Sequence, residues 1–340
     1  SSLYGNFALA GVVNVRTIER TSGATVTGSG GSYGRADATL LTGFDHDKDG
    51  GVFAIRGQRE GGWRPNAGFK LGQAHGRVVH ALSASSTIDA GVELHAAGWD
   101  SPGFLTLDQY NRRVFDAASN ITDGGYKHRA QERVSLRVVS GSGMLWRTTA
   151  YSTQGRWQLF LTTPPEGGGG EGSGSQTEEE DHRYGFGLTS AVSWSRDRYD
   201  LTIGAESRWD HSHYQNYFTT NRQRDSAQIN VVARQASAGV FVQSSVDLTR
   251  HMRLSLGGRY DARDARATPS LTVPSQTRGV VSPKAGLLYH LPQALDFYAN
   301  VSRGFRQTDG VIEDPTLPFI TAWAYETGVK LDQGNVSASV

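Results

Sequence analysis

Apolar and polar side chains alternate residue by residue along much of this chain. In the segments 88–96, 184–194 and 199–208, almost every second residue is apolar or aromatic and its neighbours are polar or small. A period of two is typical of β-strands that turn one face away from water, whereas helical spacing of apolar residues is scarce. The pattern therefore predicts an all-β protein.

The predicted strands are long, about 9–13 residues each. Strands of globular proteins average about five or six residues, and bilayer-crossing strands need about 9–11. We count about 15 strands, the last of which runs to the final residue. Short turns, such as 45–50 and 141–143, alternate with longer links: 61–73, 99–127, 156–182 and 211–234. This alternation, with aromatic residues near strand ends, is typical of antiparallel transmembrane β-barrels, which have short periplasmic turns and long extracellular loops.

A soluble or surface β-rich protein, used for binding or adhesion, is the alternative interpretation. It would bury the apolar set of each strand between two sheets, whereas a barrel would turn that set toward lipid. The positions of Leu188, Val192, Leu201 and Ile203 distinguish the two. In a barrel, charged residues such as Arg259 would face the lumen, paired with one another or with a plug.

The composition narrows the possible functions. Lys and Arg number 34 and Asp and Glu 33, a net charge of +1, so there is no excess of positive charge for nucleic-acid binding. There is no cysteine, which excludes disulfides and thiolate metal sites. The chain has no apolar run of about 18 residues, so no transmembrane helix is predicted. Glycine, at 42 residues, and aromatic residues, at 10%, fit a β-barrel.

The first residues do not follow the strand pattern and carry a separate motif. They are Leu3, Tyr4 and Gly5, followed by Gly11, Val12, Val13, Asn14, Val15 and Thr17. Further along, 282–284 reads Ser-Pro-Lys, 297–306 reads Phe-Tyr-Ala-Asn-Val-Ser-Arg-Gly-Phe-Arg, and 326–330 reads Glu-Thr-Gly-Val-Lys. In this order the four segments resemble the TonB-dependent outer-membrane receptors. In that family the first segment ends the N-terminal plug domain, and a glycine usually stands where this chain has Ala10.

The resemblance implies a 22-stranded barrel closed by a plug. This chain would hold the C-terminal end of the plug, residues 1–22, and a partial barrel of about 15 strands, residues 23–340. The family pattern also disfavours a passive porin, which lacks a plug. The resemblance implies a monomer in the outer membrane of a Gram-negative bacterium, in contact with the outer-membrane lipid.

The function that the resemblance implies is active uptake of a scarce nutrient complex, with energy supplied by the TonB protein through an N-terminal part absent here. A ferric siderophore is the expected ligand because it is the commonest in the family. Vitamin B12, haem and oligosaccharides stay open. Neither catalytic residues nor a cofactor are expected.

Aromatic residues and arginines in the longer links are the candidates for ligand contact. Aromatic rings stack on flat ligand groups, and guanidinium groups pair with carboxylates and other anions. Together with two histidines, the candidates are Trp63, Arg64, Trp99, Tyr110, Arg112, Tyr126, Trp157, His211, His213, Tyr214, Tyr217 and Arg222.

Three further patterns are weaker indications of a functional site. Residues 45–50 begin like a calcium loop, but Arg56 stands where the bidentate carboxylate belongs, which favours a polar hairpin turn. His211 and His213 lack an obvious third ligand, so no metal site is assigned. The acidic stretch 166–181 is interpreted as a solvated extracellular loop.

Overall fold

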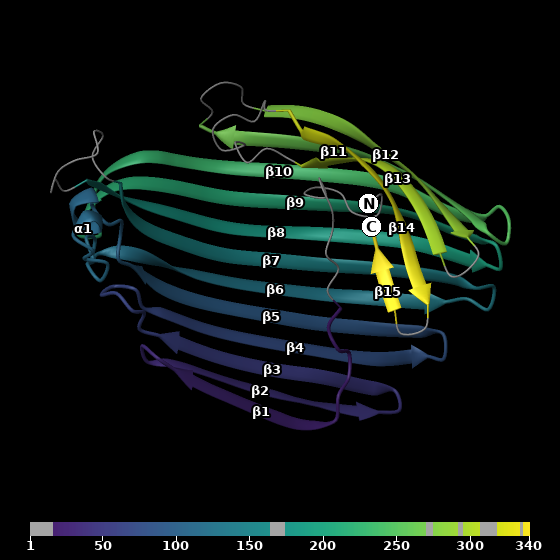
Figure 1. Cartoon of the computed structure of the whole chain (residues 1–340), viewed down its shortest axis with the longest axis horizontal. Helices are drawn as coiled ribbons and strands as arrows, with labels where there is room; N and C mark the ends of the chain where they lie inside the picture. Colours follow the sequence, from purple (N-terminus) through teal and green to yellow (C-terminus); the bar gives the residue numbers. More distant parts are fainter. Residues whose placement is uncertain (1–15, 164–173, 270–274, 292–294, 307–317, 334–335) are drawn as a thin grey trace.

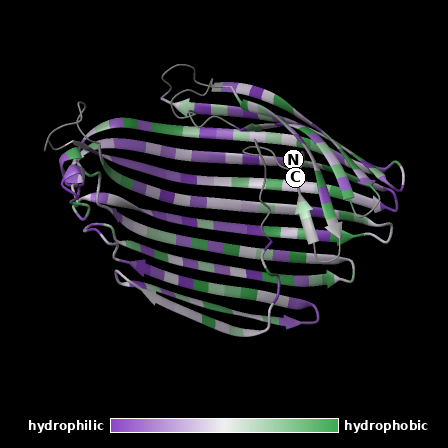
Figure 2. Cartoon of the chain, in the orientation of Figure 1, coloured by the Kyte–Doolittle hydropathy of each residue, from purple (hydrophilic) through white to green (hydrophobic). Residues whose placement is uncertain are grey.

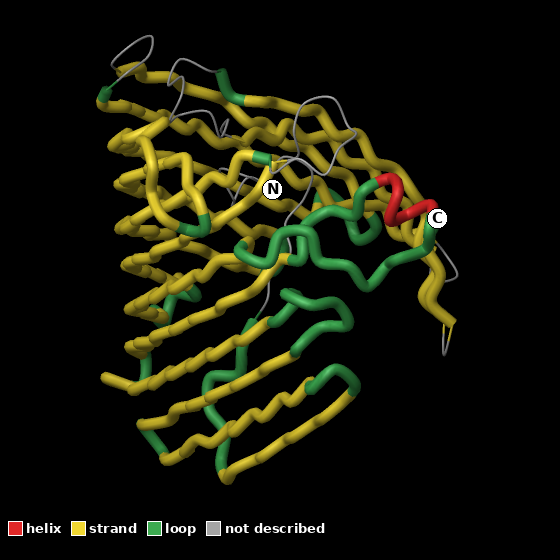
Figure 3. Tube along the Cα trace, turned by 90° about the vertical axis from the view of Figure 1, so that its left-hand side faces the viewer, coloured by secondary structure: helices red, strands yellow, loops and turns green. Residues whose placement is uncertain are grey.

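The computed structural model describes residues 16–163, 174–269, 275–291, 295–306, 318–333 and 336–340. Fifteen strands form one antiparallel sheet, in which each strand pairs with its neighbours in sequence. The sheet curves into a trough, and residues 16–22 run through its hollow (Figures 1 and 3). The predicted all-β fold with about 15 antiparallel strands is confirmed.

The strands lengthen toward the middle of the sheet. They are β1 Gly23–Gly31, β2 Arg35–His46, β3 Asp49–Glu60, β4 Phe69–Ser83, β5 Ser86–Ser101, β6 Asp123–Val139, β7 Met144–Thr163, β8 Ser175–Arg196, β9 Tyr199–Thr220, β10 Gln223–Asp247, β11 Met252–Thr268, β12 Ser275–Leu291, β13 Leu295–Arg306, β14 Ile320–Gln333 and β15 Val336–Ser339. A single short helix, α1 (Leu107–Asn111), is described between β5 and β6, and its N-terminus is capped by Thr106. No helix in the described ranges is long and apolar enough to cross a membrane.

The hollow distinguishes the two faces of the sheet. Arg77 donates a hydrogen bond to the carbonyl oxygen of Thr17 (3.3 Å) and forms an ion pair with Glu19 (3.0 Å), so its side of the sheet is the inner face. Residues paired across antiparallel strands share a face, and successive residues of a strand alternate between faces. The register therefore assigns strand residues to the inner or the outer face.

The outer face carries a band of exposed apolar side chains. Leu188 is 46% exposed, Ile203 47% and Val240 57%. Val192 and Leu201 share this face, so the apolar set points away from the hollow and not into a core between two sheets. This observation excludes the soluble two-sheet alternative. We call the band the apolar belt, and its members include Ile55, Val78, Leu94, Val134, Leu188, Ile203, Val240 and Leu256.

Aromatic side chains mark both edges of the apolar belt on the middle strands. Trp146 and Tyr199 lie toward one end of the strands, and Tyr184 and Trp209 lie toward the other, with ring centroids 5.4 Å apart. Figure 2 shows hydrophilic residues gathered beyond this second edge, at the end of the sheet that carries α1. An apolar band between two aromatic girdles is the outer surface that a transmembrane barrel presents to lipid.

The inner face is polar, and several of its buried charges are paired. Arg259, whose side chain is fully buried, donates from Nε to Asp261 (2.7 Å) and also pairs with Glu206. Arg77 pairs with Asp89 in the same way. The expected lumenal placement of Arg259 is confirmed, and seven further charged residues lie on the same face: Glu93, Arg137, Glu206, Arg208, Lys284, Glu326 and Lys330.

The connections differ at the two ends of the sheet. At the turn end, β2 and β3 are joined by residues 47–48 and β8 and β9 by residues 197–198. At the loop end, which carries α1, β5 and β6 are joined by residues 102–122. The expectation of a long link over 211–234 is wrong, because β9 and β10 continue through it to a turn at Asn221 and Arg222, both with positive φ. The predicted link 156–182 is likewise strand at both ends, 156–163 and 175–182.

Candidate ligand-binding surface on the inner face

Two adjoining cavities open on the inner face toward the loop end. One of about 480 Å³ lies over β2 to β6 and includes Arg56, His75 and His95 among its lining residues. The other, of about 370 Å³, lies over β6 to β9 and includes Trp157 and Tyr214. Lys127 and Arg129 of β6 line both cavities. The two cavities therefore form one continuous surface, which we call the lumenal basic surface.

Lys127 and Arg129 stand out because neither is neutralised by a carboxylate within the described part of the chain. Lys127 has no hydrogen bond or ion pair there, and Arg129 donates only to the side-chain oxygen of Gln131 (2.6 Å). Both side chains are exposed to the hollow. Two unpaired cations two residues apart on one face create a positive potential that attracts anions.

The carboxylates on and beside this surface already have basic partners. Asp37 pairs with Arg56 (2.8 Å), Asp181 with Arg183 (2.9 Å), and Glu93 lies 3.7 Å from a ring nitrogen of His75. The net charge of the surface is therefore positive even though acidic residues are present. Trp157 and Tyr214 add flat aromatic faces beside Lys127. The combination suits an anionic ligand with planar groups.

The structure divides the twelve predicted contact residues among three places. Trp99, Trp157 and Tyr214 lie on the inner face, and Trp157 and Tyr214 belong to the lumenal basic surface. Tyr126, His211, His213 and Tyr217 lie on the outer face. Trp63, Arg64, Tyr110, Arg112 and Arg222 lie in links, in α1 or directly after it. The expectation that all twelve lie in extracellular loops is wrong for the seven that the structure places on strands.

Two of the predicted arginines hold loops together. Arg64 donates to the carbonyl oxygens of Ala117 (2.6 Å) and Gly103 (3.2 Å), which ties the β3–β4 link to the β5–β6 link. Arg222 donates to the carbonyl oxygen of Thr122 (2.6 Å) and covers the ring of Phe160 at 5.1 Å. Their guanidinium groups are occupied by main-chain acceptors, so both are better assigned to loop packing than to a ligand.

The outer-face candidates are packed against one another. His211 stacks on Tyr184 with ring centroids 4.6 Å apart, and a ring nitrogen of His213 lies 2.8 Å from the Asn230 side-chain oxygen. Within the described residues no group of three potential metal ligands occurs. Asp45 pairs with Arg20 and Asp49 with His80 in a hairpin, in line with the polar-turn interpretation of 45–50.

The described part of the acidic stretch 166–181 is not a solvated loop, and this expectation is wrong. Glu178 and Glu180 lie on β8 with only 1% and 4% of their surfaces exposed. Arg224 donates to Glu178 (2.7 Å) and to Glu180 (2.6 Å), and Arg156 donates to Glu180 (2.9 Å). We call these four residues the loop-end ion cluster.

The ion cluster lies on the outer face beyond the aromatic edge at Tyr184, outside the apolar belt. His182, Arg224 and Arg156 all favour the ionised carboxylate and outweigh the cost of burying it, so the pKa of Glu180 falls to about 2. Sequence reasoning missed Glu178 and Glu180, together with Lys127 and Arg129. The alternation in 175–182, where every second residue is Gln, Glu, Glu and His, was the available signal of a strand.

A family model for the β-barrel of TonB-dependent receptors matches residues 19–340. The chain belongs to the TonB-dependent receptor family. Members of this family are transporters of the Gram-negative outer membrane and not enzymes, which agrees with the resemblance found in the sequence. The loop end is accordingly the extracellular end and the turn end the periplasmic one.

Solved structures of similar fold include the ferric citrate transporter FecA in its unliganded form (TM-score 0.75, 15% identity, 93% of this chain and 49% of that one). The ferric yersiniabactin uptake receptor FyuA from Yersinia pestis has a TM-score of 0.77 at 10% identity, over 98% of this chain and 57% of that one. The copper transporter OprC has a TM-score of 0.74 at 14% identity, over 95% and 54%. The chain therefore spans about half the length of these structures. No curated protein sequence matches it.

Proposed function

We propose that this chain is part of a receptor that takes up an anionic ferric siderophore across the outer membrane, driven by TonB. The lumenal basic surface is the observation that carries the proposal, because Lys127 and Arg129 are cations without carboxylate partners in the described chain. Ferric complexes of carboxylate and catecholate ligands are commonly anionic and contain planar groups. Guanidinium and ammonium groups with aromatic neighbours are suited to bind them.

Some of the structures of similar fold are receptors named for ferric citrate and ferric yersiniabactin. At 10–15% identity they support the fold alone, so the ligand class rests on the charges of this chain. Vitamin B12, haem and oligosaccharides are the alternatives that the experiment below includes.

The proposal also assigns residues 1–22 to the end of a plug domain and the energy input to TonB. The motif residues Leu3, Tyr4, Gly5, Gly11 and Asn14 lie outside the described residues, so this assignment rests on the sequence motif. The path of residues 16–22 through the hollow, held there by Arg77, is compatible with a segment that leads out of a plug.

The test is growth and binding with the full-length receptor that carries this chain. In an iron-limited strain without siderophores of its own, a panel of ferric siderophores, haem and iron-free controls is supplied, and the same strain without TonB serves as reference. We expect TonB-dependent growth on one or more anionic ferric siderophores. Growth rescue by haem alone, or uptake without TonB, would contradict the proposal.

The double variant Lys127→Glu with Arg129→Glu tests the lumenal basic surface. We expect the affinity for the active siderophore, measured by quenching of tryptophan fluorescence, to fall by roughly tenfold or more, since each lost charge-assisted contact contributes on that scale. Arg137→Glu is the matched control because Arg137 is an exposed inner-face cation nearer the periplasmic end. Equal affinities of the double variant and the control would show that the ligand binds elsewhere.

A further inference from the structure

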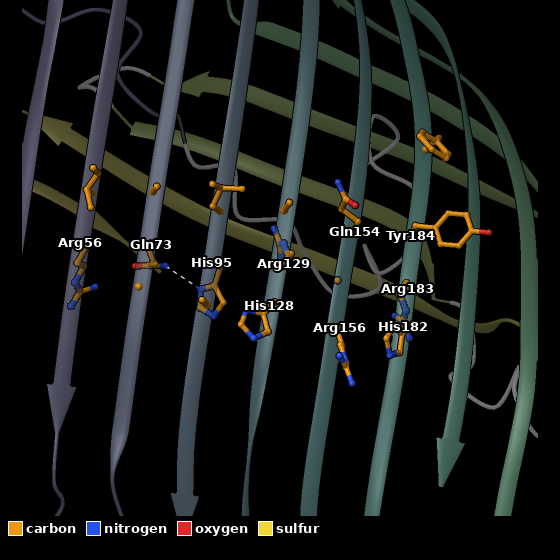
Figure 4. Close-up of a pocket in the computed structure, with 18 residues that line it drawn as sticks. Arg56, Gln73, His95, His128, Arg129, Gln154, Arg156, His182, Arg183 and Tyr184 are labelled. Carbon is orange, nitrogen blue, oxygen red and sulfur yellow. Dashed lines mark hydrogen bonds between the residues drawn. The ribbon is translucent and has the colours of Figure 1, made fainter.

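A separate hollow lies on the outer face, at the extracellular border of the apolar belt. Its volume is about 910 Å³, and it extends over β3 to β8 (Figure 4). Its floor consists of small outer-face residues, Gly72, Ala74, Ala96 and Ala130. A Cβ placed on Gly72 would meet no atom within 4 Å, so the hollow exists because side chains are missing there.

The side chains around the hollow change from apolar to basic along the strands. On the belt side, Ile55 and Leu94 stand at one wall and Phe186 at the other. On the extracellular side, a row across β6, β7 and β8 consists of His128, Arg156 and His182. Figure 4 shows these three at the same level of neighbouring strands. This order along the strands, apolar side chains and then basic ones, matches the border between the acyl chains and the headgroups of a membrane leaflet.

Further cations continue this row toward the edge of the sheet. Arg59 on β3 and Lys70 on β4 are paired in register one row further out on the outer face. Both are exposed, and neither has an ion-pair partner in the described part of the chain. Glu180, the carboxylate beside the row, is buried and already bonded by Arg156, Arg224 and His182, so His128 is the row member without a carboxylate partner in the described part of the chain. The extracellular rim of the hollow therefore has a net positive charge.

The polar residues inside the hollow fix how deep an anion can reach. Gln154 stands between the basic row and the belt, and its amide nitrogen lies 3.4 Å from Glu132, one row below. Ser152 donates to the same carboxylate. A second anion at that depth would face the Glu132 charge, whereas at the rim it meets His128 and Arg156. An anionic group is thus held at the rim, with its apolar part directed toward the belt.

We propose that this hollow binds one phosphorylated, multi-chain lipid of the outer leaflet. Its phosphate would lie on the rim beside His128 and Arg156, and its acyl chains would cover the small floor residues and Leu94. Charge-assisted hydrogen bonds from Arg and His suit a phosphate, and the burial of chain methylenes supplies the rest of the affinity. This inference needs the outer-membrane location but not the identity of the imported ligand.

The test uses the full-length receptor, purified in dodecyl maltoside and examined by native mass spectrometry with three probes. These are bisphosphorylated lipid A, the same lipid without its phosphates, and inorganic phosphate. We expect one tightly retained copy of the phosphorylated lipid, at least about tenfold weaker retention of the dephosphorylated lipid, and none of inorganic phosphate. Equal retention of the two lipids, or saturable binding of inorganic phosphate, would overturn the proposal.

Two variants with matched controls locate the binding. Gly72→Phe fills the hollow, and Gly258→Phe is its control because Gly258 is also on the outer face with no atom within 4 Å of an added Cβ. His128→Glu adds a negative charge to the rim, and His251→Glu, in the β10–β11 turn, is its control. Heat-modifiability on a gel verifies folding of each variant. We expect both hollow variants to retain the lipid at least about tenfold more weakly. The two control variants should retain it as the unaltered receptor does. Unchanged retention in folded Gly72→Phe and His128→Glu would refute the assignment.

Discussion

The two faces of β8 and β9 are built from alternate residues of the same strands, yet they follow opposite rules. On the outer face, Leu188 and Ile203 are large, apolar and about half exposed. On the inner face, Glu206 meets the fully buried Arg259, which also holds Asp261. In water the outer arrangement would be unfavourable, whereas in hydrocarbon it is stable without partners. The inner arrangement is stable because Glu206 and Asp261 match the buried charge of Arg259. Alternate positions along one strand therefore meet different surroundings, lipid on the outer face and the lumen on the inner face.

The largest effect on stability is expected when the central cation of the inner face is removed. In Arg259→Met, Asp261 and Glu206 would lose their shared partner, and we expect a loss of about 3–5 kcal/mol in the free energy of unfolding. The measurement is a urea transition of the receptor refolded into lipid vesicles. Arg137→Met, which removes an exposed inner-face charge, should shift that transition little; a similar loss in both variants would mean that pairing does not stabilise the inner face.

The next largest effect is expected when a charge is placed on the outer face. Leu188→Arg puts a cation in the middle of the apolar belt, and we expect it to cost about 2–4 kcal/mol and to slow insertion. Thr189→Arg, at the next residue, turns the same side chain inward toward Glu206, its partner in register, and should be mild. Insertion into vesicles, followed by heat-modifiability, compares the two. If both arginines were equally harmful, the assignment of faces would be wrong.

Acid should affect the loop-end ion cluster less than these changes, and with a predictable sign. Because the folded-state pKa of Glu180, about 2, lies below the usual value near 4.3, its contribution is complete above about pH 4.3 and is lost as the pH falls toward 2. Between pH 7 and pH 3 the loss is about 2 kcal/mol. Hydrogen exchange of the β8 amides beside Glu180 measures it.

Glu180→Gln supplies the control for this acid effect. The variant lacks the titrating carboxylate, so the part of the pH dependence that belongs to Glu180 should disappear. Amide protection that falls equally in both proteins between pH 7 and pH 3 would assign the effect to other groups.

The architecture could be predicted from sequence because the membrane imposes a simple rule on side chains. Alternation around Leu188 and Ile203 was visible without coordinates, and so was the inner-face placement of Arg259. What failed lies beyond the membrane, where no hydrocarbon marks one face. There β9 continues as a strand through His213 and Tyr217, and β10 returns beside it, with polar side chains on both faces; such a pattern resembles a loop in the sequence.

The candidate site was only partly predictable for a related reason. Trp157 and Tyr214 were identified by residue type. Lys127 and Arg129 are candidates only because no carboxylate on the neighbouring strands, as far as the chain is described, pairs with them. That relation depends on register between segments far apart in sequence. Glu178 was misjudged for the same reason: its partner Arg224 lies 46 residues away.

A cysteine scan of β8 tests the central claim most directly, since the chain contains no cysteine of its own. Single substitutions at each position from Tyr184 to Trp194 would carry a nitroxide label in the receptor reconstituted into bilayers. Collision rates with oxygen, which partitions into lipid, and with a water-soluble nickel chelate would then be measured. The account predicts oxygen maxima at even positions, including Leu188, and nickel maxima at odd positions, including Thr189. Collision rates without a period of two, or with the two sets exchanged, would contradict it.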